Sequence, residues 1–409
     1  MSDRSYDVVV YGATGFVGRL VVQYFAASPA ASRLRWAIGG RDKAKLEAVR
    51  NGAGPSAQMA AILIADGRDD GAVDALVGQS RIVLNTAGPF ALYGDLIVDA
   101  CVRRGTHYVD IAGETPWIRR QIQRHHETAK KNRTRIVPSC GFDSVPSDLG
   151  TYLMVRHIQE NFQSNCRGVA AYFRVYGGFN GGTIASGMHG YETGELVSRT
   201  SAFSLNPKGS FTDAQERAAS DLQHAGYDQE IEAWVGPFFM APINTRIVRR
   251  SAALYTEFGQ SYGDAFNYQE YLKYEPPFGW LKAWTVTRGM ALFEAILDRP
   301  RGRSMLKRVL PKPGEGPSEK TIRNGWFSCE LLGTAENGQR VRGLIAHDGD
   351  PSNSATTQFV SEAALSLSLD GDKLPGGPSR GGVLTPATAL GEPYVARIRS
   401  AGTRAEIGL

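Results

Sequence analysis

The chain has 409 residues, of which 42% are hydrophobic and 21% are charged, and its formal net charge is +5. This length can build two domains with separate cores, and the composition is that of a folded protein, which excludes a disordered or fibrous chain. The mild basic balance has no lysine block or aromatic-interleaved basic repeat, so we expect no nucleic-acid partner, and the four widely spaced cysteines predict reduced thiols with neither disulfides nor a metal site.

The first element is a predicted strand, Tyr6 to Tyr11, which leads into a glycine-rich turn and then a helix over residues 19–25. This order of elements binds the pyrophosphate of a dinucleotide, because glycines let the backbone approach closely and a helix N-terminus supplies N–H donors. Because the strand begins at Tyr6, there is no room for a signal peptide, and we expect a cytoplasmic protein. The predicted cofactor-binding residues of the turn are Gly12, Ala13, Thr14, Gly15, Phe16, Val17 and Gly18.

The second predicted strand, over residues 35–40, ends at Arg41. Proteins that bind NAD usually have an acidic residue here, which accepts hydrogen bonds from the ribose 2′-hydroxyl. A carboxylate would repel a 2′-phosphate, whereas a guanidinium can bind it through two hydrogen bonds. The sequence therefore predicts NADP(H), with Arg41 as the main phosphate ligand and Lys43 or Lys45 as auxiliaries. The alternative is that these side chains form the basic first turn of a solvated helix.

Strands and helices alternate through the rest of the first 147 residues. This alternation predicts an α/β fold with a doubly wound parallel sheet of the Rossmann type, whose ligand site lies at the carboxyl ends of the strands. We expect Asp66, after the third strand, near the adenine, and the loop after the fourth strand along the ribose and nicotinamide. The residues of that loop are Thr86, Ala87, Gly88 and Pro89. The predicted strands are 58–65, 81–85, 106–111 and 135–140, and the predicted helices are 94–104 and 115–132.

The pattern changes at about Asp148, where runs of strands replace the alternation. We expect a second, α+β domain with a mostly antiparallel sheet, which binds substrate and forms a homodimer. Asn337-Gly338 predicts a hairpin, because this pair readily adopts positive φ. Residues 204–225 are polar and are expected to form a mobile loop near the active site. The predicted strands are 165–176, 244–254, 262–272, 324–334 and 339–347, with helices at 183–200, 358–369 and 385–401.

Residues 278–297 are apolar and are followed by five basic residues between 299 and 308. At about 100° per residue of helix, Lys282, Arg288 and Glu294 point to three different sides. A membrane-spanning helix would bury these charges at a cost, and a helix lying on a membrane would gather them on one face. We therefore expect a buried or interface helix, and peripheral contact with the inner face of the membrane is the alternative.

Longer motifs lie along nearly the whole chain, beginning with Gly12-Ala-Thr-Gly15-Phe-Val-Gly18 and Gly39-Gly-Arg41. The others are residues 87–94, 107–114, 140–148, 241–251, 311–317 and 382–387. On these motifs the chain resembles the saccharopine dehydrogenase (saccharopine reductase) family, and within it the mycobacterial trans-acting enoyl reductases of complex-lipid biosynthesis. The pattern of elements predicts an NADP-binding domain at 1–147 and a substrate and dimerisation domain at 148–355. The resemblance implies that the helices at 356–409 return to the first domain. It also implies an acyl thioester substrate on a carrier domain of a polyketide synthase.

For such a reductase, the candidate catalytic residues are Tyr93, Glu114 and Asp143. Reduction of an enoyl thioester needs a donor to the enolate oxygen and a proton at the α-carbon. The Tyr93 phenol is neutral at pH 7 and can donate a proton or a hydrogen bond. Alternatively, its ring packs under the nicotinamide. Glu114 and Asp143 follow the fifth and sixth strands, so both can face one crevice, or each can cap the next helix. Thr183 and Ser186, at the start of a helix, are the candidate substrate-binding residues.

Two other functions remain open from the sequence. A C–N oxidoreductase acting on an amino-acid adduct would need two cationic clamps, for which Arg174, Arg246 and Arg249 are candidates. A scaffold that binds NADP(H) without catalysis is the other, because no proton donor is unmistakable. For the enoyl reductase, the predicted helix at 115–132 offers a basic surface to an acidic carrier domain, unless it is only a solvated face. Its basic residues are Arg119, Arg120, Arg124, Lys130 and Lys131.

Overall fold

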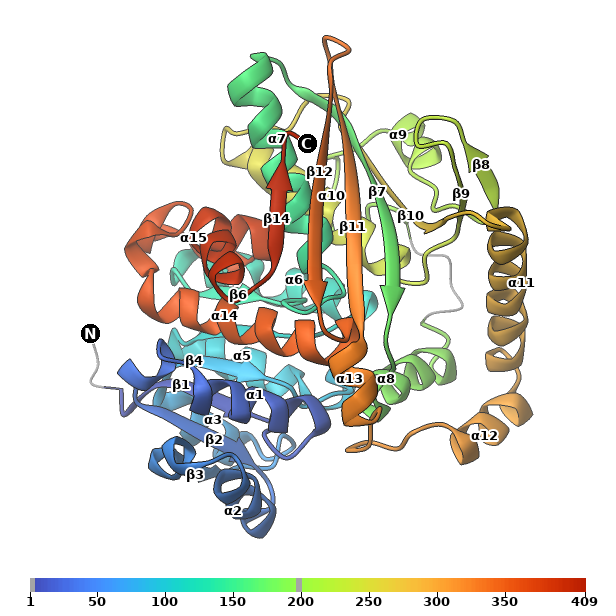
Figure 1. The fold of residues 1–409 in the computed structure, drawn as a ribbon. Coiled ribbons are helices and arrows are strands. Elements are labelled where there is room, and N and C mark those ends of the chain that lie inside the picture. Colours follow the sequence, from blue (N-terminus) through green and yellow to red (C-terminus); the bar gives the residue numbers. More distant parts are fainter. Residues whose placement is uncertain (1–3, 196–200) are drawn as a thin grey trace.

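The computed structural model describes residues 4–195 and 201–409 and contains two seven-stranded sheets (Figure 1). Sheet A has the strand order β13-β6-β5-β4-β1-β2-β3, and each neighbouring pair is parallel. This confirms the predicted doubly wound sheet. Its strands are β1 (Tyr6–Tyr11), β2 (Trp36–Gly40), β3 (Ala61–Ile64), β4 (Ser80–Asn85), β5 (His107–Asp110), β6 (Arg135–Val137) and β13 (Gly382–Val383).

Sheet A is apolar on both faces because helices cover both sides. Val8 and Val10 of β1 pack with α1 and α14, and Val9 faces α3, α5 and α6 on the opposite side. All three valines are completely buried. The covering helices are α1 (Phe16–Ala27), α2 (Lys43–Gly52), α3 (Asp70–Gly78), α5 (Asp95–Arg104), α6 (Thr115–Lys131) and α14 (Thr356–Leu369).

Sheet B has the order β14-β12-β11-β7-β10-β9-β8 and is antiparallel except for the β7–β10 pair. The predicted hairpin joins β11 to β12, and Gly338 has a φ of 89° in its turn. The mostly antiparallel second sheet is thus confirmed. Its strands are β7 (Cys166–Tyr176), β8 (Gly226–Asp228), β9 (Ala233–Gly236), β10 (Asn267–Tyr274), β11 (Trp326–Ala335), β12 (Arg340–Asp348) and β14 (Arg404–Ile407).

Helices α7 (Val145–Phe162), α10 (Ala241–Glu257) and α15 (Pro386–Ser400) pack together, and α7 lies against β7, β11 and β12 of sheet B. The C-terminal part of the chain enters both sheets, because β13 pairs with β6 of sheet A and β14 pairs with β12 of sheet B. Thr385 caps α15 by accepting a hydrogen bond from the Thr388 N–H. The last fifty residues therefore connect the two halves of the molecule (Figure 1).

The predicted strand at 244–254 is wrong, because these residues lie in helix α10. Ile243, Ile247 and Val248 suit either a strand or one face of a helix, and a short apolar run does not distinguish the two. Three further predicted strands are longer than the observed ones, since β3 begins at Ala61, β6 ends at Val137 and β10 begins at Asn267. Helix α8 (Gly181–Glu192) ends before the predicted 183–200 helix does, and residues 196–200 lie outside the described part.

The polar stretch 204–225 contains one short helix, α9 (Asp213–Ala218). No helix in the described part of the chain is both long and apolar enough to cross a membrane.

The four cysteines, Cys101, Cys140, Cys166 and Cys329, are buried free thiols. The remaining elements are α4 (Phe90–Tyr93), α11 (Gly279–Leu297), α12 (Pro300–Val309), α13 (Glu319–Asn324), a π-helical turn (Pro351–Ala355) and 3-10 turns at Ala31–Arg33, Pro55–Met59, Gly371–Lys373 and Gly377–Ser379.

A buried carboxyl group joins α7 to α10 and α15. Asp148 accepts hydrogen bonds from the Ser251 hydroxyl and, at 2.8 Å, from the Ala387 N–H. In Asp148→Ala this N–H loses its buried partner, so we expect the free energy of unfolding in urea to fall by about 2–3 kcal/mol. The exposed Asp264→Ala is the matched control, with an expected change within about 0.5 kcal/mol. Equal changes in the two variants would contradict this role.

Candidate active site

The turn between β1 and α1 has no space for side chains at Gly12 and Gly18. A β-carbon on Gly12 would lie 2.7 Å from the Ala87 N atom, and one on Gly18 would overlap the Gly12 carbonyl oxygen. Gly12 also has a φ of 81°, which favours glycine. The Thr86 hydroxyl donates to the Tyr11 carbonyl at 3.1 Å. The loops after β1 and β4 are therefore in direct contact, as the predicted cofactor site requires.

Helix α1 begins at this turn without a side-chain cap. Its N-cap residue is Gly15, and no side-chain hydrogen bond caps the helix within the described chain. The N–H groups of a first helical turn lack intrahelical partners and favour an anion. Residues 312–317, from far along the chain, border the same turn: Arg19 donates to Thr14 O at 3.0 Å and to Gly314 O at 2.9 Å, and Gly316 packs on the Phe16 ring. The uncapped turn thus fits a pyrophosphate.

Arg41 is exposed at the end of β2, and its side chain has no hydrogen bond or ion pair with any described residue. Lys45 and Lys43, in contrast, pair with Asp42 at 3.7 Å and with Glu47 at 3.9 Å. Arg41 is therefore the unpaired cation at this strand end, as a ligand for a 2′-phosphate should be.

The neighbouring loop after β3 adds an acidic side chain, Asp66, and a basic one, Arg68. Burial and the nearby Asp66 charge raise the pKa of Tyr11 to about 12, while Arg41 acts in the opposite direction. The Asp66 carboxylate accepts a hydrogen bond from the Arg68 backbone N–H at 3.0 Å. Arg68 in turn donates to the Tyr93 hydroxyl at 3.1 Å and lies 5.0 Å from the centre of its ring. The Tyr93 phenol is thus turned toward the Asp66 loop, where the adenosine end is expected, and this orientation does not favour it as a proton donor.

Glu114 and Asp143 follow β5 and β6 at the carboxyl ends of these strands, in different environments. Both Glu114 carboxylate oxygens accept backbone hydrogen bonds at 2.8 Å, from Phe90 N and Ala91 N. Glu114 therefore holds the loop of Gly88 and Pro89 in place from the start of α4. This occupied carboxylate fits a positioning residue better than the predicted catalytic one.

The half-buried Asp143 carboxyl is next to the backbone of Gly113, where a β-carbon would lie 3.2 Å from Asp143 Oδ2. Among residues 4–195 and 201–409 it has no hydrogen-bond or ion-pair partner, and burial alone raises its pKa to about 7. A carboxyl group that is partly protonated near neutral pH can donate a proton. Asp110 is in a different environment. Burial also raises the pKa of Asp110 to about 7, but this carboxylate accepts hydrogen bonds from the backbone N–H groups of Ala112 and Ser139.

Helix α8 of the second domain meets the loop after β4. A β-carbon on Gly88 would lie 3.6 Å from the Ser186 hydroxyl, so this side chain borders the expected nicotinamide position. Asn180 caps α8 by accepting from Gly182 N and Thr183 N, at 3.0 and 3.1 Å. Asn353 fixes that cap, because it accepts from Asn180 Nδ2 at 3.0 Å. The capped amides are not free for an anion, and the hydroxyls of Thr183 and Ser186 remain as the polar groups of this helix start.

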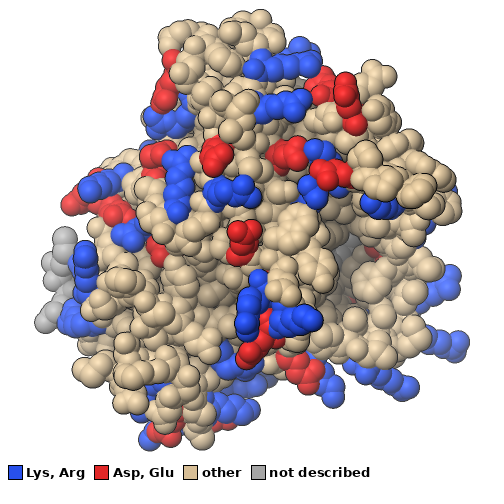
Figure 2. Space-filling view, viewed as in Figure 1, with Lys and Arg blue, Asp and Glu red and all other residues tan. Residues whose placement is uncertain are grey.

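An apolar wall lies beside the start of α8. Tyr176 at the end of β7 and Phe179 in the following loop are 57% and 46% exposed, and Phe239, 38% exposed, contacts Phe179 with ring centres 5.4 Å apart. Figure 2 shows a hollow on this face between the lower end of sheet B and α11. Exposed aromatic rings beside a polar site are typical of a surface that receives an apolar chain.

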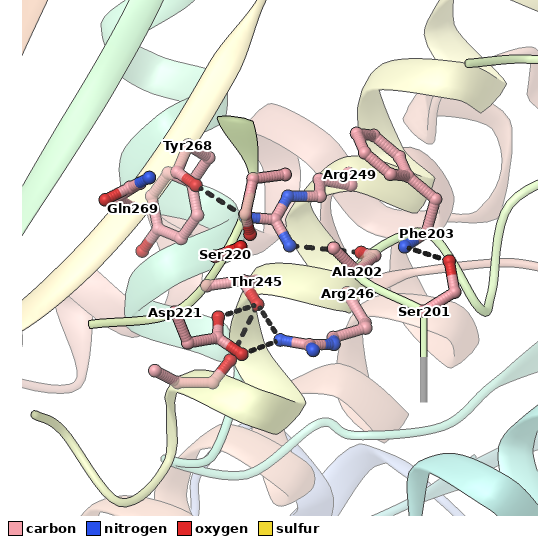
Figure 3. Close-up of polar contacts among 12 residues, drawn as sticks. Ser201, Ala202, Phe203, Ser220, Asp221, Thr245, Arg246, Arg249, Tyr268 and Gln269 are labelled. Carbon is pink, nitrogen blue, oxygen red and sulfur yellow. Dashed lines mark hydrogen bonds and ion pairs between the residues drawn. The ribbon is translucent and has the colours of Figure 1, made fainter. Parts of the chain in front are cut away.

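The three arginines considered as clamps for an amino-acid adduct are bound within the chain. Arg174 pairs with Glu275 at 2.9 Å. Arg246 and Arg249 lie on α10, not on a strand, and Arg246 pairs with Asp221 and with Thr245 Oγ1 (Figure 3). Arg249 donates to three carbonyl oxygens, those of Ala202, Ala219 and Tyr268, at 2.9–3.0 Å. These bonds leave no free pair of cations for a dicarboxylate, which counts against C–N chemistry.

Sequence reasoning missed the residues that support the site from a distance. Arg19, Arg68 and Asn353 each contact a predicted site residue or its cap, but none belongs to a pattern with a known spacing. The loop at 312–317 carried a signal, because it lies in the Pro-Lys-Pro-Gly-Glu-Gly-Pro motif of residues 311–317, one of the motifs of the resemblance. His107 has a structural role, because its Nδ1 accepts a hydrogen bond from the Arg135 backbone N–H at 3.0 Å, and burial lowers its pKa to about 4.

Comparison with known proteins supports the same cofactor. A family model described as the saccharopine dehydrogenase NADP binding domain matches residues 8–137. The trans-acting enoyl reductase of Mycobacterium leprae (strain TN) is 34% identical over 421 residues, which cover 98% of this chain and 97% of that protein. A relative in Mycobacterium tuberculosis (strain H37Rv), provisionally given the same name, is 36% identical over 98% of this chain and 96% of its own length.

Among solved structures, apo saccharopine dehydrogenase (L-Glu forming) of Saccharomyces cerevisiae matches with a TM-score of 0.51. The match covers 98% of this chain and 99% of that one, at 13% sequence identity. At this identity it shows the shared fold alone. Both sheets described above thus belong to one known architecture.

The free guanidinium of Arg41 allows a test of cofactor choice. A hydrogen-bonded charge pair with a phosphate contributes about 1.5–3 kcal/mol, so Arg41→Ala should raise the Kd for NADPH by about 10- to 100-fold. The Kd for NADH should change less than about threefold, since NADH has no 2′-phosphate. Lys45→Ala is the control and should have a much smaller effect, because Lys45 pairs with Asp42. Quenching titrations of intrinsic fluorescence measure these constants, and equal losses for both cofactors would contradict the assignment.

Proposed function

We infer the function from one premise: the chain belongs to the saccharopine dehydrogenase family, in the group that contains the mycobacterial trans-acting enoyl reductases. It is an NADPH-dependent oxidoreductase, and its glycine-rich turn, uncapped α1 and unpaired Arg41 fit NADP(H). We propose that it reduces the C=C bond of an α,β-unsaturated acyl thioester in complex-lipid biosynthesis. The bound NADPH would supply the hydride for this reduction.

The observation that carries this proposal is the unpaired Asp143 carboxyl at the edge of sheet A. Hydride addition to an enoyl thioester leaves negative charge that must be relieved by a proton at the α-carbon. With a pKa of about 7, Asp143 holds a proton in a large share of molecules at neutral pH, whereas an ordinary aspartate does not. Asp143 would act as the general acid, and solvent would restore its proton between turnovers.

Other residues would orient the substrate. Glu114 holds the loop of Gly88 and Pro89 through its bonds to Phe90 N and Ala91 N, so we assign it a positioning role. Ser186, next to Gly88, would donate a hydrogen bond to the thioester carbonyl, and Thr183 lies one turn earlier in α8. The aromatic wall beside α8 would contact the acyl chain and exclude water from the reacting bond.

We propose a carrier domain of a polyketide synthase as the partner that presents the acyl chain, because trans-acting enoyl reductases are named for acting on another protein's intermediate. The basic face of α6 offers less free charge than its sequence suggests, since Arg120, Arg124 and Lys130 pair with Glu195, Asp95 and Glu257. We also propose that the enzyme is cytoplasmic and forms a homodimer. Light scattering of the purified protein would test the homodimer.

The function is tested by following NADPH absorbance with a panel of enoyl thioesters and imino acids. We expect oxidation of NADPH with the thioesters and none with the imino acids. Single-turnover stopped-flow separates a reductase from a protein that only binds the cofactor. Turnover of imino acids alone, or binding of NADPH without any turnover, would contradict the proposal.

The pKa of Asp143 predicts how the rate depends on pH. The reaction uses the protonated acid, so kcat should be constant below about pH 6 and fall as the pH rises through about 7. The isosteric Asp143→Asn cannot donate this proton; we expect a loss of kcat of about 100-fold or more, with the Kd for NADPH within about twofold of the wild type. A full-rate Asp143→Asn enzyme, or one that keeps the same fall of kcat near pH 7, would exclude Asp143 as the acid.

A further inference from the structure

Helix α11 stands at the outer edge of the molecule and is largely uncovered (Figure 1). Of its nineteen residues, only Gly279, Ala283 and Leu297 are buried. It touches β8, β9, β10 and α12, Leu297 near its end packs with Met188 of α8, and most of its other side chains are exposed. Of the predicted buried or interface helix, burial is therefore not observed in the single chain, and the interface stays a prediction. Exposed apolar surfaces of this kind are typical of interaction sites.

The outward surface of α11 is apolar and rich in tryptophan. Trp280 and Trp284 are each 54% exposed, and Leu292 is 64% exposed. At about 100° per residue, these three and Leu281 fall within an arc of about 120°. Met305 and Val309 of the following helix α12 are exposed apolar residues as well. Tryptophan is the residue that most favours the boundary between lipid headgroups and acyl chains.

Basic residues outnumber acidic residues in α11 and α12. Residues 279–309 contain seven basic and two acidic residues. The two acids, Glu294 and Asp298, lie toward α8, where burial and their charges raise the pKa of Tyr191 to about 12. Of the exposed charged residues on α11, Arg288 lies within the arc of the tryptophans, and Lys282 and Glu294 lie outside it.

Helix α12 adds further positive charge beside this apolar surface. The side chains of Arg299, Arg301 and Arg308 have no hydrogen bond or ion pair among the described residues, and basic side chains project from this edge in Figure 2. Free cations that flank an apolar, tryptophan-bearing face complement an anionic surface with an apolar interior.

We propose that α11 and α12 form a membrane-docking surface that lies in the headgroup region of an anionic lipid bilayer. The exposed tryptophans and leucines would enter the boundary with the acyl chains, and the free arginines would bind lipid phosphates. No described helix can span a bilayer, so the contact is peripheral. Docking in this way would place the hollow between α11 and sheet B at the lipid surface, where an apolar acyl chain can enter (Figure 2).

Vesicle binding of the full-length protein tests the proposal without reference to the reaction. Sedimentation with vesicles of 70% phosphatidylcholine and 30% phosphatidylglycerol should bind the wild type, with a blue shift of tryptophan emission, and pure phosphatidylcholine vesicles should bind far less. A variant with Arg299→Gln, Arg301→Gln and Arg308→Gln should bind about 100-fold more weakly, since each basic residue near an anionic surface contributes roughly a fivefold factor. Trp280→Ser with Trp284→Ser should weaken binding by at least about tenfold.

A charge-matched control removes three other exposed cations, through Arg119→Gln, Lys131→Gln and Arg133→Gln, and should bind vesicles within about threefold of the wild type. An equal loss of vesicle binding in this control would show that binding depends only on net charge, and would overturn the proposal. A second copy of the chain would be the occupant if the tryptophan variant turned a dimer into a monomer in light scattering while vesicles bound neither form. A carrier domain would be the occupant if that variant lost turnover only on a carrier-bound substrate and the wild type bound no vesicles.

Discussion

The close contact of Gly12 with Gly18 and with the loop of Thr86 and Ala87 is the constraint on which the rest of the site depends. It brings the start of α1 onto the β4 loop with no side chain between them, and this leaves the first-turn N–H groups free. Glu114 then fixes the β4 loop from the opposite side, through Phe90 N and Ala91 N. The expected nicotinamide position is thus held between two backbone segments whose distance is set by the absence of β-carbons.

The second domain reaches this position through contacts that cross long stretches of sequence. Asn353 in the π-helical turn holds Asn180, which caps α8 and so fixes the direction of Ser186. The loop at 312–317 lies on Phe16 and receives a hydrogen bond from Arg19. Direct contacts therefore link the predicted cofactor-binding residues to the predicted substrate-binding residues. A change at Asn353, far from the reacting atoms, would alter the site through α8.

The sequence predicted the parts of the site that follow from local patterns. A strand, a glycine-rich turn and a helix form one unit, so the Gly12 to Gly18 region and the Arg41 position could be placed without knowledge of the fold. The direction of a side chain depends on tertiary neighbours, and for this reason Tyr93 is turned to Arg68 and Glu114 is occupied by backbone N–H groups. The same limit explains α10, whose apolar spacing suits two kinds of secondary structure. Nor could the exposure of α11 be read from its sequence, since an apolar run predicts burial unless the surrounding surface is known.

The C-terminal segment has a consequence for biosynthesis, because strand β13, which completes one edge of sheet A beside β6, is translated long after that sheet's other strands. At about 5–20 residues per second, the ribosome needs roughly 10–50 s between β6 and β13. Helix α14, which covers α1 and β4, arrives in the same late interval. During that time the nascent nucleotide-binding half exposes an unpaired strand edge and an apolar face. We therefore expect ribosome-bound chains that stop before residue 356 to be protease-sensitive and to recruit chaperones, with protection appearing only when the end of the chain leaves the exit tunnel.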